Sequence, residues 1–377
     1  MNYFFLYQIL KAQFSSGAAT HTSDERAFGI LSQEFHSTKM SYSFHSSNLP
    51  FDIESALDNP NMDFSYPIFH PTKSMKSDGC IILLHGLNER SWEKYLPWGY
   101  QLANYTRKTI ILFPIAYHMN RSPKAWCNPR LMRNFVKDRQ IHMPMANNLS
   151  VANVALSERL TNHPERFLLS GYQAANDLLA LVEKIKQGRY PLVNKGAQVD
   201  FFAYSIGAFL AQVMMMAHGE DKLAESRLFM FCGGSAFEDW QGVSKYIMDS
   251  VAFERLHAYY RDDVCQTSNK EVQHVLNETP LGQAFLDLLS VRNLKRRGEG
   301  YYASLKERIS AVVLKNDTVV IADKVKMALK GMRVDEWDLN YKYSHIMPFP
   351  LLSNKLVNQV NEAFDKLMLK SSLLFTT

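Results

Sequence analysis

Short apolar segments alternate with helix-length segments along most of this chain, and this alternation constrains the fold more than any other feature. The apolar segments are rich in β-branched and aromatic residues and lie at 62–69, 80–85, 109–113, 199–204, 227–232 and 309–314, with a more polar one at 334–340. Helix-length segments lie between them at 91–106, 171–188, 206–220 and 323–331. Strands that alternate with helices predict an α/β fold with a mostly parallel, doubly wound sheet covered on both faces.

The ends of the sheet and the N-terminal segment are less regular. Pro67 lies inside the segment at 62–69 and predicts an edge strand, since proline donates no hydrogen bond to a sheet ladder. The polar segment at 334–340 also predicts an edge strand. Apolar residues recur at helical spacing between residues 3 and 14, which predicts an amphipathic helix packed on the domain. Residues 37–62 are rich in Ser, Asn and Pro, which is typical of irregular surface chain.

These patterns divide the chain into an extension and a large domain. Residues 1–61 are predicted to form the N-terminal helix and an irregular extension packed on the core, and residues 62–377 the α/β domain. Two intervals, 114–170 and 233–308, are too long for simple connections. Insertions at the carboxyl ends of strands usually build the rim or lid of a site, so we expect this role for both.

Composition and charge argue against several classes of function. A net charge of +5 over 377 residues is too small and too dispersed to indicate a nucleic-acid partner, although residues 130–139 and 292–297 are locally basic. No apolar run approaches the ~20 residues that a membrane-spanning helix needs, so no stable membrane insertion is expected. The four cysteines show no C-x-x-C spacing, which favours free thiols and no zinc site.

The first residues leave two interpretations of location open. The segment MNYFFLYQILKAQF lacks a basic N-terminal region, and Gln8 and Lys11 interrupt its apolar part. These features favour a helix of a cytoplasmic protein over a cleaved signal peptide, which stays the alternative.

One serine stands where a buried strand is predicted to turn directly into a helix. The stretch VDFFAYSIGAFL places Ser205 between the apolar segment at 199–204 and a small-residue helical pattern. A serine hydroxyl becomes an effective nucleophile only beside a base, and a sharp strand-to-helix turn lifts it out of the sheet. Crowding at such a turn requires small residues two positions before and two after the serine, where Ala203 and Gly207 stand. The alternative is a serine that simply caps the helix.

A base and an orienting acid follow Ser205 in the chain. Asp317 comes just after the apolar segment at 309–314, at the strand end where sites of open α/β sheets form. His345 is the only histidine that follows Asp317, in a loop before the final helix, which is expected from about residue 352. Glu238 and Asp239 are the competing acids. We expect Asp323, rather than Asp317, to cap the helix that follows.

Other groups are expected around this serine. The backbone amides of Leu87 and Ile206 are candidate donors for an oxyanion hole, because Gly86 lets the chain turn and Ile206 begins a helix. The stretch FPIAYHMNRSPKAW follows the second buried strand, so its side chains should lie near the site mouth. An arginine there can bind a carboxylate or phosphate, with a structural arginine as the alternative. The possible substrate-binding residues are His85, Tyr117, His118, Arg121 and Tyr204, and we expect His85 mainly to shape its loop.

These motifs together resemble the α/β-hydrolase superfamily. The resemblance is carried by HGL at 85–87, AYSIGA at 203–208, NDT at 316–318 and SH at 344–345, and it covers the chain from roughly residue 62 onward. Some bacterial lipases of the superfamily also have alanine at the position of Ala203. The resemblance implies a three-layer α/β/α sandwich with about eight strands and cap insertions over the catalytic face.

The nucleophile's identity narrows the expected chemistry. Serine with aspartate and histidine is typical of acyl transfer to water, so we expect a serine hydrolase that cleaves a carboxylic ester, esterase- or lipase-like. The partner would be a small-molecule ester or acyl substrate, and no metal or organic cofactor is expected. A peptidase or amidase with the same residues is the first alternative. A binding protein that has the fold without turnover is the second, since fold does not guarantee activity.

Overall fold

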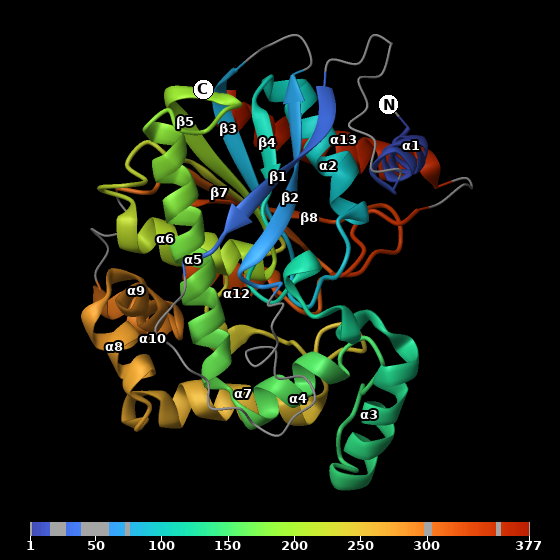
Figure 1. Cartoon of the computed structure of the whole chain (residues 1–377), viewed down its shortest axis with the longest axis vertical. Helices are drawn as coiled ribbons and strands as arrows, with labels where there is room; N and C mark the ends of the chain where they lie inside the picture. The colour runs from blue at the N-terminus through green and yellow to red at the C-terminus, as the bar shows by residue number, and fades with distance from the viewer. Residues whose placement is uncertain are drawn as a thin grey trace.

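One eight-stranded sheet forms the centre of the part of the chain that the structure, a computed structural model, describes: residues 2–15, 28–38, 60–71, 76–297, 304–351 and 356–376 (Figure 1). The strands are β1 (Phe28–His36), β2 (Asp63–Pro71), β3 (Ser77–Leu84), β4 (Thr109–Leu112), β5 (Val193–Tyr204), β6 (Leu228–Phe231), β7 (Ile309–Leu314) and β8 (Arg333–Trp337). Their order is β1-β2-β4-β3-β5-β6-β7-β8. β1–β2 and β2–β4 pair antiparallel and the other neighbours pair parallel, which confirms the predicted α/β sandwich.

The central strands are buried on both faces, as their sequences predict. All four residues of β4 and all six of β7 are buried, and so are the last six residues of β5. Parallel strands covered by helices on both sides present no face to water, so their residues are apolar at successive positions. This is why the strand positions could be predicted without the tertiary structure.

The prediction for one edge of the sheet is wrong. β2 is an interior strand, because β1 pairs with it from Phe28↔Pro71 to His36↔Asp63 and forms the edge instead. β2 tolerates Pro67 because its ladder with β4 covers only Ile68 and Phe69, so the missing N–H lies beside the end of that ladder. β8 is the other edge, as predicted.

Part of the predicted N-terminal extension is therefore not irregular. β1 lies within residues 1–61, and its sequence FGILSQEFH mixes apolar and polar residues too evenly to resemble the buried strands. Residues 39–59 of the segment predicted to be irregular lie outside the described residues. The division of the chain at residue 62 stays a prediction.

Helices cover each face of the sheet and enclose a separate apolar core. α5 (Glu165–Lys186), α6 (Ile206–His218) and α12 (Ala322–Ala328) cover one face. The N-terminal helix α1 (Tyr3–Ser15), α2 (Leu96–Thr106) and the C-terminal helix α13 (Val357–Thr376) pack together on the other face (Figure 1). The predicted amphipathic helix thus buries Tyr3, Leu6 and Leu10 against α2 and α13.

The two long intervals form a group of helices beyond the carboxyl ends of the parallel strands (Figure 1). The first contains α3 (Pro129–His142), α4 (Val154–Asn162) and the start of α5. The second contains α7 (Ser250–Ala258), α8 (Lys270–Glu278), α9 (Pro280–Leu288) and α10 (Val291–Arg297). Short single turns complete the described helices: Glu93–Tyr95, Met119–Arg121, Lys124–Cys127, Phe237–Asp239, Tyr259–Asp263 and Val264–Gln266.

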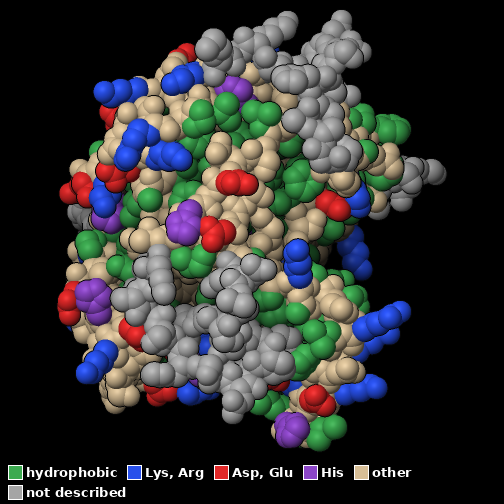
Figure 2. Space-filling model, viewed as in Figure 1, with side chains coloured by type: hydrophobic (Ala, Val, Ile, Leu, Met, Phe, Trp, Pro, Cys, Tyr) green, Lys and Arg blue, Asp and Glu red, His purple; other side chains and the backbone are tan. Residues whose placement is uncertain are grey.

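An ion pair joins the two insertions. Arg139 of α3 is buried and contacts Asp249, the N-cap residue of α7, with Nε to Oδ2 at 2.6 Å. In contrast, Arg130, Arg133 and Lys137 on the same helix are exposed, and Figure 2 shows Lys and Arg side chains on the part of the surface where α3 lies. The locally basic stretch at 130–139 is therefore mostly a solvated helix face. No helix among the described residues is long and apolar enough to cross a bilayer.

Candidate active site

Ser205 lies at the turn between β5 and α6 in a strained backbone conformation. β5 ends at Tyr204 and α6 begins at Ile206, so a single residue reverses the chain. Ser205 has φ 55° and ψ −119°, a region that L-residues rarely adopt. Its side chain does not cap the helix. The strain projects the hydroxyl away from the sheet edge, which is the geometry expected of a nucleophile turn.

Small residues around this turn are required by close packing. A Cβ at Gly207 would lie 2.7 Å from Leu84 Cβ and 2.9 Å from His85 O. At Gly233, just after β6, a Cβ would lie 2.4 Å from Ala208 Cβ. Neither position can hold a larger residue without moving a neighbouring strand or loop. Ala203, where a glycine is common in such motifs, is fully buried in β5 and fits as it stands.

Ser205, His345 and Asp317 form a continuous hydrogen-bonded chain. Ser205 Oγ lies 2.7 Å from His345 Nε2, and His345 Nδ1 lies 2.7 Å from Asp317 Oδ2. A carboxylate only accepts, so Nδ1 carries the proton and donates it, which leaves the Nε2 lone pair toward the serine hydroxyl. Both His345 and Asp317 are buried, at 3% and 5% exposure. This arrangement can remove a proton from Ser205 and hold the resulting imidazolium.

Asp317 is held by the chain that follows it. Its second oxygen, Oδ1, accepts hydrogen bonds from the backbone amides of Val319 at 2.8 Å and Val320 at 3.0 Å. The expectation that Asp323 caps the next helix is wrong, because Ile321 is the N-cap residue and Asp323 lies in the first turn of α12. Asp317 is thus oriented by the turn at residues 317–320, which precedes the helix.

The competing acids bind elsewhere. Asp239 Oδ1 forms an ion pair with Lys324 Nζ at 2.8 Å, and Glu238 Oε1 accepts the backbone N–H of Val291 at 2.9 Å. Neither carboxylate has a hydrogen bond to His345 in the described structure. Asp317 is therefore the acid that the fold places on this histidine.

Two backbone amides beside Ser205 carry no hydrogen bond. In the described ranges, neither Leu87 N–H nor Ile206 N–H donates to a protein acceptor, whereas the neighbouring Gly86 N–H donates to Tyr95 Oη at 2.9 Å and Gly207 N–H to His85 O at 3.1 Å. Leu87 and Ile206 line the same cavities. The two amides are thus available as donors to a ligand.

A buried polar network connects the loop at Gly86 and Leu87 with the loop that carries His345. Tyr204 Oη donates to the backbone oxygen of His345, and its ring stacks on the imidazole with centroids 5.5 Å apart. Lys94 Nζ contacts Glu89 and donates to Ile346 O at 3.2 Å. Tyr95, which accepts the Gly86 amide, donates to the same Glu89 carboxylate at 3.1 Å. These hydrogen bonds fix the positions of the two loops relative to each other.

Three of the predicted substrate-binding residues have other roles. Arg121 is fully buried, with Nη2 paired to Asp177 at 2.8 Å and Nη1 donating to Pro114 O, so it braces the loop after β4. It lines none of the three described cavities that border Leu87. His85 is also fully buried: Nδ1 donates to Gly86 O and Nε2 accepts the Ile115 amide at 3.0 Å. Burial lowers the pKa of His85 to about 3, so it is neutral and shapes its loop. Tyr204 is buried and bonded to His345.

Tyr117 and His118 line a cavity whose described wall does not include Ser205, and their role in substrate binding stays a prediction. His118 Nδ1 donates to Ala116 O at 2.9 Å, so its proton is on that nitrogen. Burial holds the pKa of His118 well below its usual value, and the ring is therefore neutral.

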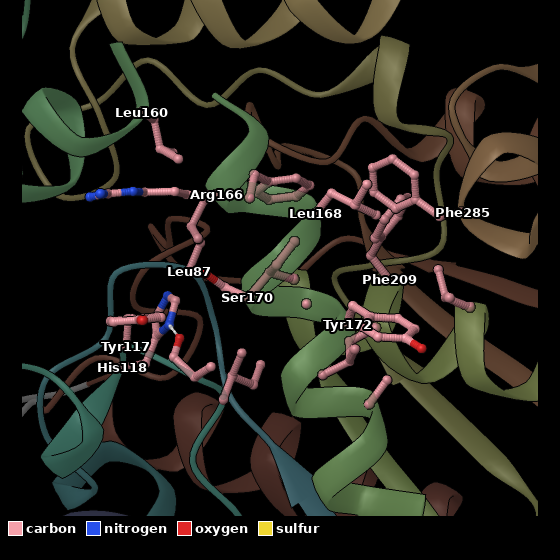
Figure 3. Close-up of a pocket in the computed structure, with 18 of the residues that line it drawn as sticks. Leu87, Tyr117, His118, Leu160, Arg166, Leu168, Ser170, Tyr172, Phe209 and Phe285 are labelled. Carbon is pink, nitrogen blue, oxygen red and sulfur yellow. Dashed lines mark hydrogen bonds between the residues drawn. The ribbon is translucent and has the colours of Figure 1, made fainter. Parts of the chain in front are cut away.

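Leu87 borders three of the cavities in the described structure. The serine cavity is lined by Ser205 and by side chains from the second insertion, including Trp240 and Phe253. The α5 cavity lies on the other side of Leu87, Ile206 and Phe209, which line both. Figure 3 shows it with Leu87, Tyr117 and His118 at one end, Phe209 and Phe285 at the other, and the α5 residues Leu168, Ser170 and Tyr172 between them. The outer cavity is lined by Asn88, Trp126 and Ile346, beside His345.

One group of potential metal ligands lies at this site. Ligand atoms of Cys232, Asp317 and His345 all lie within 4.8 Å of one another, and all three residues are buried. Asp317 and His345 already bond each other and, through His345, Ser205. Burial and the neighbouring Asp317 carboxylate raise the pKa of the Cys232 thiol well above its usual value, which disfavours the thiolate that a metal would bind.

Several residues of the site have no counterpart in the sequence expectations. Gly233 and Gly234 follow the buried strand β6, and this Gly-Gly pair was a usable signal for a turn at the site. Phe209 lies four residues after Ser205 on α6, so helical spacing places it on the same face. Trp240 and His257 belong to the second insertion, whose path over the serine had no local signal.

Comparisons with known proteins give a family but no activity. The structure of a thermostable esterase from Pseudomonas putida ECU1011 is similar over 98% of this chain and 91% of the esterase chain, at 12% identity and a TM-score of 0.41. The structure of carboxyl esterase 2 from Tuber melanosporum is similar over 97% of this chain and 97% of the esterase chain, at 10% identity and a TM-score of 0.42. At such identities and TM-scores these likenesses say nothing of activity. No curated protein matches the sequence. The model of a family of unknown function, DUF6051, matches residues 1–376, and the chain belongs to this family.

Proposed function

We propose that this protein is a serine hydrolase that cleaves a carboxylic ester through an acyl-enzyme on Ser205. The observation that carries the proposal is the hydrogen-bonded chain from Ser205 Oγ through His345 to Asp317, with links of 2.7 Å each. The strained turn at Ser205 and the two unbonded amides at Leu87 and Ile206 support it. Each part is needed for acyl transfer, and they meet at one sheet edge.

The proposed steps follow from the positions of these groups. Ser205 Oγ attacks the ester carbonyl carbon while His345 Nε2 takes the hydroxyl proton. The carbonyl oxygen becomes an anion that accepts hydrogen bonds from the Leu87 and Ile206 amides, each contributing roughly 3–4 kcal/mol to transition-state stabilisation. His345 then protonates the departing alcohol. Water repeats the sequence on the acyl-enzyme and releases the acid, with no cofactor required.

An ester is favoured over an amide by the surroundings of the serine. The serine cavity is bordered mostly by apolar and aromatic side chains from the second insertion, such as Trp240, Met248 and Phe253. A peptide bond brings a polar N–H and C=O on each side, which such walls leave unpaired at a cost of about 1–3 kcal/mol per group. Peptidase or amidase activity and binding without turnover are alternative outcomes of the test below. The cytoplasmic location stays a prediction.

The first experiment labels the protein with a fluorophosphonate and measures hydrolysis of p-nitrophenyl acetate. We expect wild type to be labelled and active, and Ser205→Ala to lose the label and about 10⁴-fold or more in kcat. An unlabelled and inactive wild type would exclude the proposal. Label that persists in Ser205→Ala would mean that another serine is the nucleophile. A matched set of aminoacyl nitroanilides measures any amide preference.

A pair of carboxylate variants tests the acid. We expect Asp317→Asn to lower kcat by about 10⁴-fold, because the amide favours the wrong histidine tautomer. Asp239→Asn should retain nearly full activity, since Asp239 pairs with Lys324 and not with His345. The reverse result would reassign the acid. The thermal unfolding midpoints of both variants control for folding.

A further inference from the structure

The α5 cavity is an apolar space that is lined by both Leu87 and Ile206 and that no step above uses. Its walls come from α4, α5, α6 and α9, with Leu160, Leu168, Phe209 and Phe285 among the apolar side chains (Figure 3). It touches Leu87 and Ile206, whose amides point to the ligand in the proposed mechanism. An apolar cavity with few polar groups is the usual form of a small-molecule site.

The α5 cavity shares lining residues with the serine cavity. Leu87, Ile206 and Phe209 line both the α5 cavity and the serine cavity. The Phe209 ring packs edge-to-face on the rings of Trp240 and Phe285, with ring centroids 4.8 Å and 5.9 Å apart, respectively. We therefore expect an acyl chain attached to Ser205 to enter the α5 cavity past these shared residues.

One wall of this apolar cavity carries a polar atom without a partner. His118 is 8% exposed, and its Nε2 has no hydrogen-bond partner in the described structure. Because Nδ1 holds the proton and donates to Ala116 O, Nε2 is an acceptor on the other side of the ring (Figure 3). A buried acceptor left unpaired costs about 1–3 kcal/mol. A ligand in this cavity can satisfy such an acceptor by supplying a donor.

We propose that the α5 cavity binds the acyl part of the substrate and that this acyl chain carries a hydrogen-bond donor, a hydroxyl or an amide N–H, which His118 Nε2 accepts. This inference rests on the proposed hydrolysis at Ser205 and specifies its substrate class: a substituted, otherwise apolar acyl ester. His118 is then a specificity-determining residue. It discriminates between acyl chains by the hydrogen bond that a plain chain leaves unmade.

Gly171 offers an independent way to test where the acyl chain lies. It lines the cavity from α5, and a Cβ built there meets no atom within 4 Å. A Cβ at this position therefore has open space, so we expect a larger side chain to extend into the cavity. Replacing glycine inside a helix does not reduce helix propensity. Ala180 is an exposed residue of the same helix and serves as the matched control.

The first measurement compares p-nitrophenyl acetate with p-nitrophenyl octanoate. We expect Gly171→Leu to lower kcat/KM for the octanoate by about tenfold or more and to leave the acetate within about twofold, because only the long chain enters the cavity. Ala180→Leu should change neither. Equal effects on both esters, or none, would exclude the cavity as the acyl site. If wild type hydrolyses neither the acetate nor the octanoate, the proposed function itself is wrong.

The second measurement tests the donor with octanoyl esters hydroxylated at successive carbons and with one that has an amide N–H in the chain. In wild type, kcat/KM for at least one of these esters should exceed that for plain octanoate by about tenfold. This factor corresponds to the net free energy of one hydrogen bond. The hydroxyl and amide series distinguish the two donor sources. If no substituted ester exceeds octanoate, the proposal is wrong.

Two His118 variants separate the acceptor from the loop contact. Asparagine keeps a short donor for Ala116 O and lacks an atom at Nε2, whereas glutamine places an amide oxygen near the Nε2 position. We expect His118→Asn to lower the ratio of kcat/KM for the substituted ester to kcat/KM for octanoate to about one, and His118→Gln to retain part of this ratio. A preference that survives in His118→Asn, with unfolding midpoints unchanged, would assign the donor's partner to another residue.

Discussion

At the scale of single residues, Tyr204 shows how the site depends on groups that never meet the substrate. Its hydroxyl donates to the His345 backbone oxygen and its ring stacks on the imidazole. Tyr204→Phe removes the hydrogen bond and keeps the ring. We expect kcat to fall by about tenfold or more with KM nearly unchanged, because a histidine misplaced by a fraction of an ångström transfers protons less effectively. Steady-state kinetics on p-nitrophenyl acetate measures both constants.

The control for this variant is another buried tyrosine. Tyr66 on β2 bonds Tyr190 Oη at 3.3 Å, away from Ser205, so Tyr66→Phe should leave kcat unchanged. A Tyr204→Phe enzyme with wild-type kcat across the pH range would mean that the histidine loop is positioned by Lys94 and packing alone.

At the scale of elements, the cap over the strand ends is joined by Arg139. Its guanidinium contacts Asp249 at 2.6 and 3.0 Å, Glu158 at 3.0 Å and Thr161 at 2.8 Å. Arg139→Met leaves the fully buried Asp249 carboxylate without its cation. Removing one partner of a buried pair costs about 3–5 kcal/mol, so we expect a loss of this size in the free energy of unfolding, measured by urea denaturation.

An exposed arginine on the same helix provides the comparison. Arg133→Met should change the free energy of unfolding by no more than about 0.5 kcal/mol. Hydrogen exchange should then show faster opening of α3, α4 and α7 in Arg139→Met, with the sheet unaffected. Equal stability of the two variants would mean that apolar packing alone joins the insertions.

At the scale of the whole molecule, buried neutral histidines make stability depend on pH. Burial lowers the pKa of His85 from 6.5 to about 3 and that of His257 to about 4, and it lowers the pKa of His118 as well. The unfolded chain therefore binds more protons than the folded one below about pH 6.5, so stability is present above that pH and is lost as pH falls toward 4 and 3. Urea denaturation should give a smaller free energy of unfolding at about pH 5 than at about pH 7.5.

A variant separates this effect from other titrations. His257 stacks between Phe237 and Phe253, and His257→Phe removes one titrating group from that stack. The change in stability between the two pH values should become smaller in this variant. The same change in wild type and variant would assign the pH dependence to the other buried histidines, His85 and His118. Asp177 and Asp200 do not produce it, because burial raises the pKa of both carboxyls, which stabilises the folded chain as pH falls.

Local patterns were sufficient for the parts of the molecule that burial alone determines. The central strands could be located because two covered faces leave only apolar residues, as in β4 and β7. β1 escaped prediction because an edge strand with one partner tolerates polar residues such as Ser32 and Gln33. Pro67 led to the wrong prediction of an edge strand, because the β2–β4 ladder is short. A proline fits in an interior strand where the neighbouring ladder does not need its N–H.

The sequence by itself determined where the reactive side chains lie along the chain: Ser205 and Asp317 each follow an apolar segment, and His345 follows the more polar edge segment. Parallel strands bring their carboxyl ends to one edge of the sheet. Only the tertiary structure decided what surrounds them. It paired Arg121 with Asp177, 56 residues away, and removed it from the site. It also placed Phe209 between two cavities and left His118 Nε2 without a partner. Such contacts join residues distant in the chain, and their geometry depends on the packing of whole elements, which no local spacing encodes.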